Sequence, residues 1–255
     1  MNPLRPLSVP GYRPLFAAMV LTVFAQGAWA LYLAMQTLDL GATAATLSSV
    51  VAWSGIGLLA GSLPAGVLAD RVAKKSIIVG VLTVNLAAST TTSTAAIFDA
   101  ATFWMLAVSA FVIGVSTAFF FPAYTALVPV LVGSDDLMAV NGLEGTTRPL
   151  VGQTLAPGVV GAVIGASVPA AGGYLIAGAL GLALIAALRL PAPCSAETDA
   201  EAPATSALRD LLDGFGYVAR TRWVRSSVLL AAAMGLAVTG PLDVLLPALI
   251  RSTHD

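Results

Sequence analysis

The chain has 255 residues, of which 58% are hydrophobic and 10% charged, with a mean hydropathy of +0.90. Soluble domains usually carry about 25% charged residues, so this composition indicates a membrane protein, which has the lipid bilayer as a partner. A net charge of -1 gives no basic surplus for a nucleic-acid partner. One histidine, His254, and one cysteine, Cys194, cannot supply a metal cluster, an intrachain disulfide or a Ser-His-Asp triad. We therefore expect no enzyme activity, no metal and no cofactor.

Seven apolar runs follow one another along the chain, each long enough to cross about 30 Å of hydrocarbon as a helix. The predicted spans are 14–38, 46–69, 77–98, 102–131, 137–166, 169–190 and 227–250. The expected fold class is an all-α membrane protein. With a cytoplasmic N-terminus, ten of the twelve basic residues fall on the cytoplasmic side, as the positive-inside rule requires. They are Arg5, Arg13, Arg71, Lys74, Lys75, Arg189, Arg209, Arg220, Arg222 and Arg225.

The chain divides into three predicted parts: a six-helix bundle over 1–190, a cytoplasmic linker over 191–225, and a further span within 226–255. The linker begins with Pro, Ala, Glu, Asp, Ser and Thr, which cannot build a core. Leu208, Leu211, Leu212, Phe215 and Val218 then recur at helical spacing beside arginines. This pattern predicts an amphipathic helix, either on an anionic leaflet or as an ordinary loop helix.

A polar turn, Gly-Val-Leu-Ala-Asp-Arg-Val-Ala-Lys-Lys over 66–75, separates the second and third spans. Any multi-span protein can carry a basic cytoplasmic loop. The order of residues here resembles the signature loop of the major facilitator superfamily, Gly-x-Leu-Ala-Asp-Arg-x-Gly-Arg-Lys. The matching residues are Gly66, Leu68, Ala69, Asp70, Arg71 and Lys75, whereas Ala73 and Lys74 replace glycine and arginine. We also expect Gly66 to let two backbones approach closely.

The resemblance implies a twelve-helix secondary transporter, of which this chain covers the first six-helix half and one more helix. It implies that Asp70, with Arg71, Lys74 and Lys75, latches the cytoplasmic gate against a helix of the second half. We interpret the chain as truncated, missing the C-terminal half of the fold, and expect it not to transport alone. A half-size protein that pairs with another chain is the alternative.

Glu144 and Arg148 are four residues apart on the fifth predicted span, so they share one helix face and can form an ion pair. Two interpretations stay open for them: substrate binding or proton coupling, and a structural pair that joins the bundle. Asp243, on the seventh span, is either a proton carrier or an acid solvated at the outer end. Gln26, Trp29 and Tyr124 either line a cavity, with aromatic faces for amphipathic or cationic substrates, or make helix contacts.

Small residues recur along the fifth span, namely Gly152, Pro157, Gly158, Gly161 and Gly165. They predict close helix packing and a kink at Pro157. The series resembles the fifth-helix signature of facilitator antiporters, and Phe121-Pro122-Ala123-Tyr124 with Ala139-Val140-Asn141-Gly142 resembles the siderophore and macrolide exporter branch. Simple packing is the other interpretation.

Together these resemblances imply proton-coupled efflux of a hydrophobic or amphipathic small molecule across a bacterial plasma membrane. The alternative function is a non-transporting membrane module that scaffolds or pairs with another chain.

Overall fold

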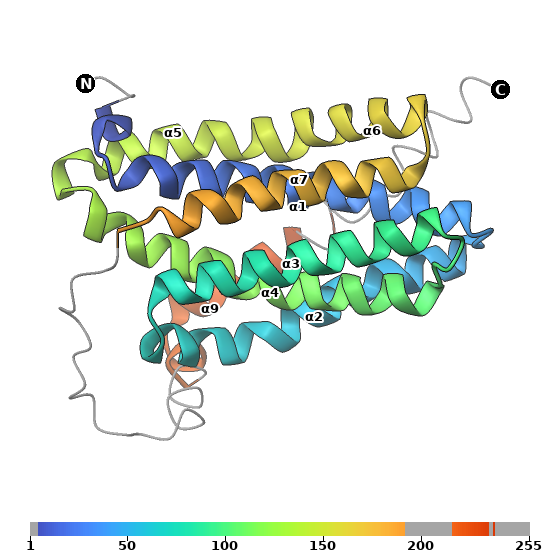
Figure 1. Cartoon of the computed structure of the whole chain (residues 1–255). Helices are drawn as coiled ribbons and strands as arrows, with labels where there is room; N and C mark the ends of the chain where they lie inside the picture. The colour runs from blue at the N-terminus through green and yellow to red at the C-terminus, as the bar shows by residue number, and fades with distance from the viewer. Residues whose placement is uncertain (1–4, 192–215, 235–236, 238–255) are drawn as a thin grey trace. The chain divides into compact units, whose positions relative to one another are not determined.

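The computed structural model describes residues 5–191, 216–234 and 237, without the side chains of residues 63, 67 and 69–71. The chain separates into two units, Met1–Thr198 and Asp199–Asp255. The first unit is a bundle of long helices (Figure 1). In the described part of the second unit, α9 covers Arg222–Met234.

Six spans cross the first unit, as the hydropathy of the sequence predicts. Helices are the expected form because hydrocarbon offers no partner to an unpaired backbone N–H or C=O. Four spans are single helices, α1 (Tyr12–Asp39), α2 (Ala44–Arg71), α3 (Lys74–Ile97) and α4 (Phe103–Leu131). The fifth combines α5 (Leu137–Pro149), a π-helical segment (Leu150–Leu155) and α6 (Ala156–Ala166), and the sixth is α7 (Pro169–Leu188). Of the predicted seventh span, 227–250, the described residues include Ser227 to Met234 within α9, and the rest lies outside them.

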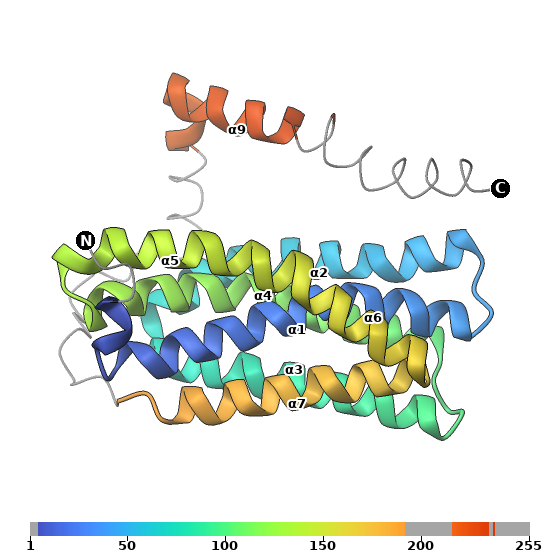
Figure 2. The ribbon, with the colours of Figure 1, turned by 90° about the horizontal axis from the view of Figure 1, so that it is seen from above.

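The packing of the six spans repeats in two sets of three. Helix α2 packs along α4, and in the same way the fifth span packs along α1, through its π-helical segment and α6. Helix α3 packs against α4 as α7 packs against α1, and α3 and α7 also contact each other (Figure 2). This exchange of partners indicates an approximate two-fold relation between spans one to three and spans four to six. Internal repeats of this kind are common in secondary transporters.

Helices α2 and α4 touch backbone to backbone at glycines. A Cβ atom built on Gly57 would lie 2.9 Å from the carbonyl carbon of Phe111, and one on Gly61 would lie 2.9 Å from the carbonyl oxygen of Val115. From the other side, a Cβ atom on Gly114 would lie 3.0 Å from the backbone nitrogen of Leu58. Only residues without a side chain allow this distance, so these glycines fix how α2 and α4 cross.

The glycines of the fifth span differ in what surrounds them in the described part of the structure. A Cβ atom on Gly152 would lie 2.9 Å from Cγ1 of Val23, and one on Gly161 would meet only the side chain of Leu31 at 3.4 Å. No described atom comes within 4 Å of a Cβ atom on Gly158 or Gly165. The regular spacing of glycines therefore does not mark a face that another described helix covers.

The fifth span is irregular one turn before the predicted kink. Regular α-helical hydrogen bonding stops over Leu150–Leu155 and resumes at Ala156. Pro157 lies in the first turn of α6 and has no backbone N–H to donate to the preceding turn. The wider π-helical hydrogen bonds accommodate this missing donor, so the irregularity falls on its N-terminal side.

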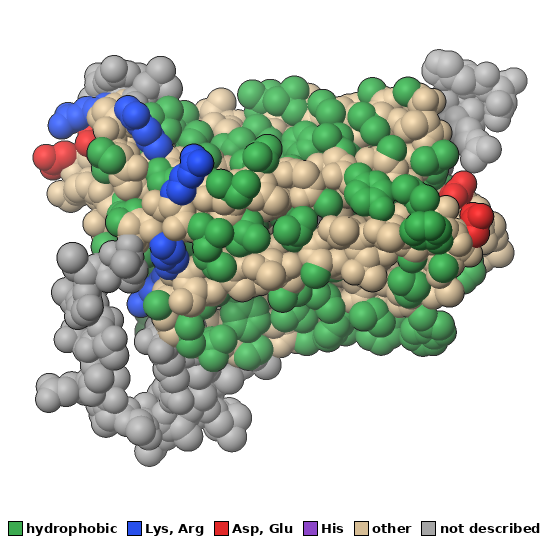
Figure 3. Space-filling model, viewed as in Figure 1, with side chains coloured by type: hydrophobic (Ala, Val, Ile, Leu, Met, Phe, Trp, Pro, Cys, Tyr) green, Lys and Arg blue, Asp and Glu red, His purple; other side chains and the backbone are tan. Residues whose placement is uncertain are grey.

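The two ends of the bundle differ in charge. Alternating helix directions bring Arg5, Arg13, Lys74, Lys75 and Arg189 to one end, which we call the basic end. The opposite end carries Asp39 and Asp99, and we call it the acidic end. Figure 3 shows blue side chains gathered at the basic end, with red ones beside them, whereas the charged side chains visible at the acidic end are all red.

Candidate functional site

Three helices bring their side chains together near the basic end of the bundle. Glu144 and Arg148 come from α5, Tyr124 from α4 and Tyr12 from the start of α1. We call these four residues the charged cluster. Glu144 lies seven residues into α5, and Tyr124 seven residues before the end of α4. At 1.5 Å per residue both lie roughly 10 Å inside their helices, within the length that a bilayer covers.

The carboxylate of Glu144 accepts hydrogen bonds from all three other members of the cluster. Tyr124 Oη donates to its Oε1 at 2.6 Å, and Tyr12 Oη donates to the same oxygen at 3.3 Å. Arg148 Nη2 donates to Oε2 at 2.7 Å, which confirms the ion pair predicted from the four-residue spacing. Such contacts offset the cost of placing the carboxylate of Glu144, a residue that is 9% exposed, among apolar helices.

The guanidinium group of Arg148 also lies over two aromatic rings. Its Cζ is 4.9 Å from the centroid of Phe121 and 5.5 Å from that of Tyr124. The side chain is 31% exposed, against 11% for Glu144. Its Nε is buried and has no hydrogen-bond partner among the described residues. Arg148 is therefore the member of the cluster that a ligand can reach most easily, through the exposed part of its side chain and not through the buried Nε.

Sequence reasoning identified Glu144, Arg148 and Tyr124 but missed Tyr12 and the ring of Phe121 under Arg148. Tyr12 hydrogen-bonds across 132 positions of sequence, which no local pattern can reveal. Tyr12 precedes the predicted first span, 14–38, by two residues, whereas in the structure it is the first residue of α1.

The other predicted cavity residues make helix contacts in this conformation. Gln26 Nε2 is 3.4 Å from Oγ1 of Thr117, which links α1 to α4. Trp29 is only 5% exposed and its ring lies 5.2 Å from that of Tyr32. Its indole nitrogen has no hydrogen-bond partner in the described part of the chain. Tyr124 is fully buried, so its ring faces Arg148 and Phe120, not open space.

The predicted gating loop joins α2 to α3 at the basic end. Lys75 Nζ donates to the carbonyl oxygens of Leu188, at 3.1 Å, and Leu190, at 2.5 Å. Its positive charge thus lies at the C-terminal end of α7, where the helix dipole favours a cation. Lys74 is the first residue of α3.

No described atom lies within 4 Å of a Cβ atom built on Gly66, so its close backbone approach stays a prediction. The side chains of Asp70 and Arg71 lie outside the described part of the structure, and so does Asp243. Within the described ranges, no three His, Cys, Asp or Glu side chains lie close enough to hold a metal ion.

Comparison with known proteins places the chain in a family. Residues 15–255 match the family described as Major Facilitator Superfamily, which covers most of the sequence. Comparisons with curated proteins and with solved structures gave no match. The six apolar helices and their paired packing agree with such a membrane bundle. The chain belongs to the major facilitator superfamily, a family of membrane transporters.

Proposed function

We propose that this chain forms part of a proton-coupled exporter of a hydrophobic or amphipathic small molecule in a bacterial plasma membrane, with its N-terminus in the cytoplasm. The observation that carries the proposal is the carboxylate of Glu144, held inside the spans by Tyr124, Tyr12 and Arg148. Ionisable groups within transporter spans commonly belong to substrate or proton pathways. The fifth-span sequence around Gly152 and Pro157, which resembles that of antiporters, supports the direction of transport.

In this proposal Glu144 carries the proton and Arg148 contacts the substrate. An ionised Glu144 holds Arg148 through their 2.7 Å contact, and the guanidinium, stacked on the ring of Phe121, then presents a cation beside an apolar surface. Such a surface suits an amphipathic molecule with an aromatic or anionic part. A protonated Glu144 has lost the charge that keeps the guanidinium in this place, so protonation weakens substrate binding. Substrate and proton thus compete for one pair of side chains.

We further propose that transport needs a second six-helix bundle of the same fold. The gate residues Asp70, Arg71 and Lys74 would meet a helix of that bundle. Cells that make this chain alone should accumulate amphipathic dyes as control cells do, and supplying the second bundle should lower accumulation. Dye efflux by the chain alone would contradict the need for a second bundle and leave the role of Glu144 open to its own test.

The role of Glu144 is tested in the complemented exporter with Glu144→Gln, which keeps the shape of the side chain and removes its charge. We expect proton-driven efflux to fall about ten-fold or more, the equivalent of one charged hydrogen bond of roughly 1.5 kcal/mol. The matched control is Asp99→Asn at the acidic end, since Asp99 has φ 53° and asparagine tolerates that conformation. Equal efflux by Glu144→Gln and Asp99→Asn would refute the proposed role.

A non-transporting membrane module is the second candidate. Glu144 joins α1, α4 and α5 through its three hydrogen bonds, so the cluster could serve only to hold the bundle together. Sequencing the gene beyond the codon for Asp255 helps to separate the candidates. Five more apolar spans in frame would support the exporter, and no membrane-like sequence would favour the module.

A further inference from the structure

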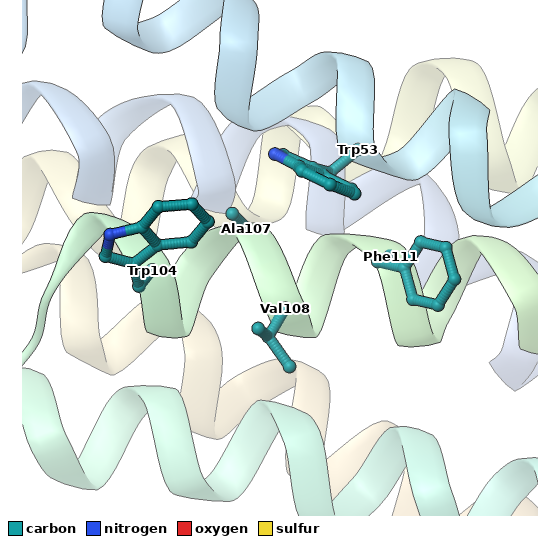
Figure 4. A pocket seen from close by; sticks show the side chains of 5 residues that line it. All are labelled: Trp53, Trp104, Ala107, Val108 and Phe111. Carbon is teal, nitrogen blue, oxygen red and sulfur yellow. The ribbon is translucent and has the colours of Figure 1, made fainter.

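Two neighbouring helices form an apolar pocket that the charged cluster does not use. Trp53 of α2 and Trp104, Ala107, Val108 and Phe111 of α4 line a cavity of about 130 Å³. Figure 4 shows the ring of Trp53 above α4, with Trp104 on one side and Phe111 on the other. The lining is hydrocarbon and aromatic carbon except for the two indole nitrogens, so the pocket offers little to a polar ligand.

The pocket lies in the half of the bundle nearest the acidic end. Trp104 is the second residue of α4 and Trp53 the tenth of α2, and both helices begin at that end. At 1.5 Å per residue the pocket therefore extends from the helix ends to roughly 13 Å below them. Both helices belong to spans that can cross a membrane. This depth corresponds to the boundary between headgroups and hydrocarbon and the upper part of the acyl chains.

The side chains at the mouth of the pocket are exposed, whereas its floor is closed. Trp104 is 73% and Val108 58% exposed, while Ala107 on the floor is 5% exposed. Trp53 and Phe111 make an edge-to-face contact at 6.1 Å across the two helices. The close crossing of α2 and α4 below them holds this aromatic wall in place. The pocket is thus preformed, with a closed floor and an exposed mouth.

We propose that this pocket binds one acyl chain of a phospholipid from the leaflet at the acidic end. A volume near 130 Å³ is close to the roughly 150 Å³ of an apolar cavity that accepts benzene, so it admits several methylene groups. Hydrocarbon is the solvent around a membrane span, and an apolar wall against it has no polar group to desolvate. Tryptophan prefers the membrane interface, where the Trp104 indole N–H can donate to an ester carbonyl.

The test uses the full chain in nanodiscs that contain phosphatidylcholine with a photoreactive diazirine in the middle of one acyl chain. Mass spectrometry then locates the crosslinks. We expect them at Val108 and Phe111 in excess over Leu182 on α7, which is also 58% exposed and measures ordinary contact with surrounding lipid. Equal labelling of Val108 and Leu182 would overturn the proposal. An absence of lipid crosslinks at Val108, because a second copy of the chain or the segment 199–255 covers the pocket, would overturn the proposal too.

Variants separate a specific pocket from general lipid contact. Ala107→Phe fills the floor and should abolish the excess labelling at Val108, whereas Leu182→Phe should leave it unchanged. Trp104→Ala removes an exposed side chain that is not part of the core, so we expect this variant to fold. It should reduce the excess labelling at Val108. Full excess labelling in both Ala107→Phe and Trp104→Ala would contradict the proposed pocket.

Discussion

Replacing Gly57 with alanine should push α2 away from α4. The new Cβ atom would lie 2.9 Å from the carbonyl carbon of Phe111 and 3.0 Å from its Cα, and it would be nearer still to the carbonyl oxygen. The first of these distances falls 0.5 Å short of the 3.4 Å at which ordinary contact begins. All three atoms belong to the backbone, so no side chain can rotate away. Overpacking of this kind typically costs about 1–3 kcal/mol.

Gly55 on the same helix provides the matched control, because no described atom lies within 4 Å of a Cβ atom built there. Gly55→Ala should be neutral or gain up to about 1 kcal/mol from helix propensity. Thermal unfolding in detergent, followed by circular dichroism, measures both variants. A chain of this size loses roughly 2–4 °C of Tm per kcal/mol, so Gly57→Ala should unfold several degrees below Gly55→Ala. Equal Tm values would refute the close packing of α2 on α4.

Three other variants test separate parts of the bundle. Tyr124→Phe removes the 2.6 Å hydrogen bond to Glu144 and should lower the free energy of unfolding, measured by chemical denaturation, by about 1.5–3 kcal/mol. An unchanged free energy of unfolding would show that this bond is not formed. Gly173→Ala brings a Cβ atom within 2.9 Å of the Tyr32 ring and should therefore lower Tm. The control is Gly178→Ala, because no described atom lies within 4 Å of a Cβ atom at Gly178. A lower Tm for Gly178→Ala than for Gly173→Ala would contradict the packing of α7. Lys75→Met removes the two hydrogen bonds to the C-terminal end of α7 and should speed amide hydrogen exchange in the last turn of α7. Unchanged exchange there would show that Lys75 does not cap this helix.

The six spans of the bundle could be predicted from the sequence because apolar length alone forces a helix across hydrocarbon. The ion pair of Glu144 and Arg148 could be predicted for a similar reason, since residues four apart share one helix face. Both inferences depend only on distances within one helix.

What the sequence could not supply is which helix faces meet. Gly161 and Gly165 have the spacing of a packing motif, but that spacing does not say whether another helix covers the face, and no described atom approaches Gly165. Gly57 and Gly114 do make such a contact, between helices separated in sequence by a whole span. Tyr12 joined the charged cluster by the same kind of long-range contact.

The most direct test of the central claim, that Glu144 couples protons to substrate, is the number of protons released when an amphipathic dye binds the purified chain in weakly buffered nanodiscs. The four residues of the charged cluster all belong to one unit, Met1–Thr198, so the purified chain contains the whole cluster. If substrate and proton compete for Glu144 and Arg148, dye binding should release protons at acidic pH and Glu144→Gln should abolish the release. Equal release by wild type and Glu144→Gln would contradict the account and assign proton exchange to another group.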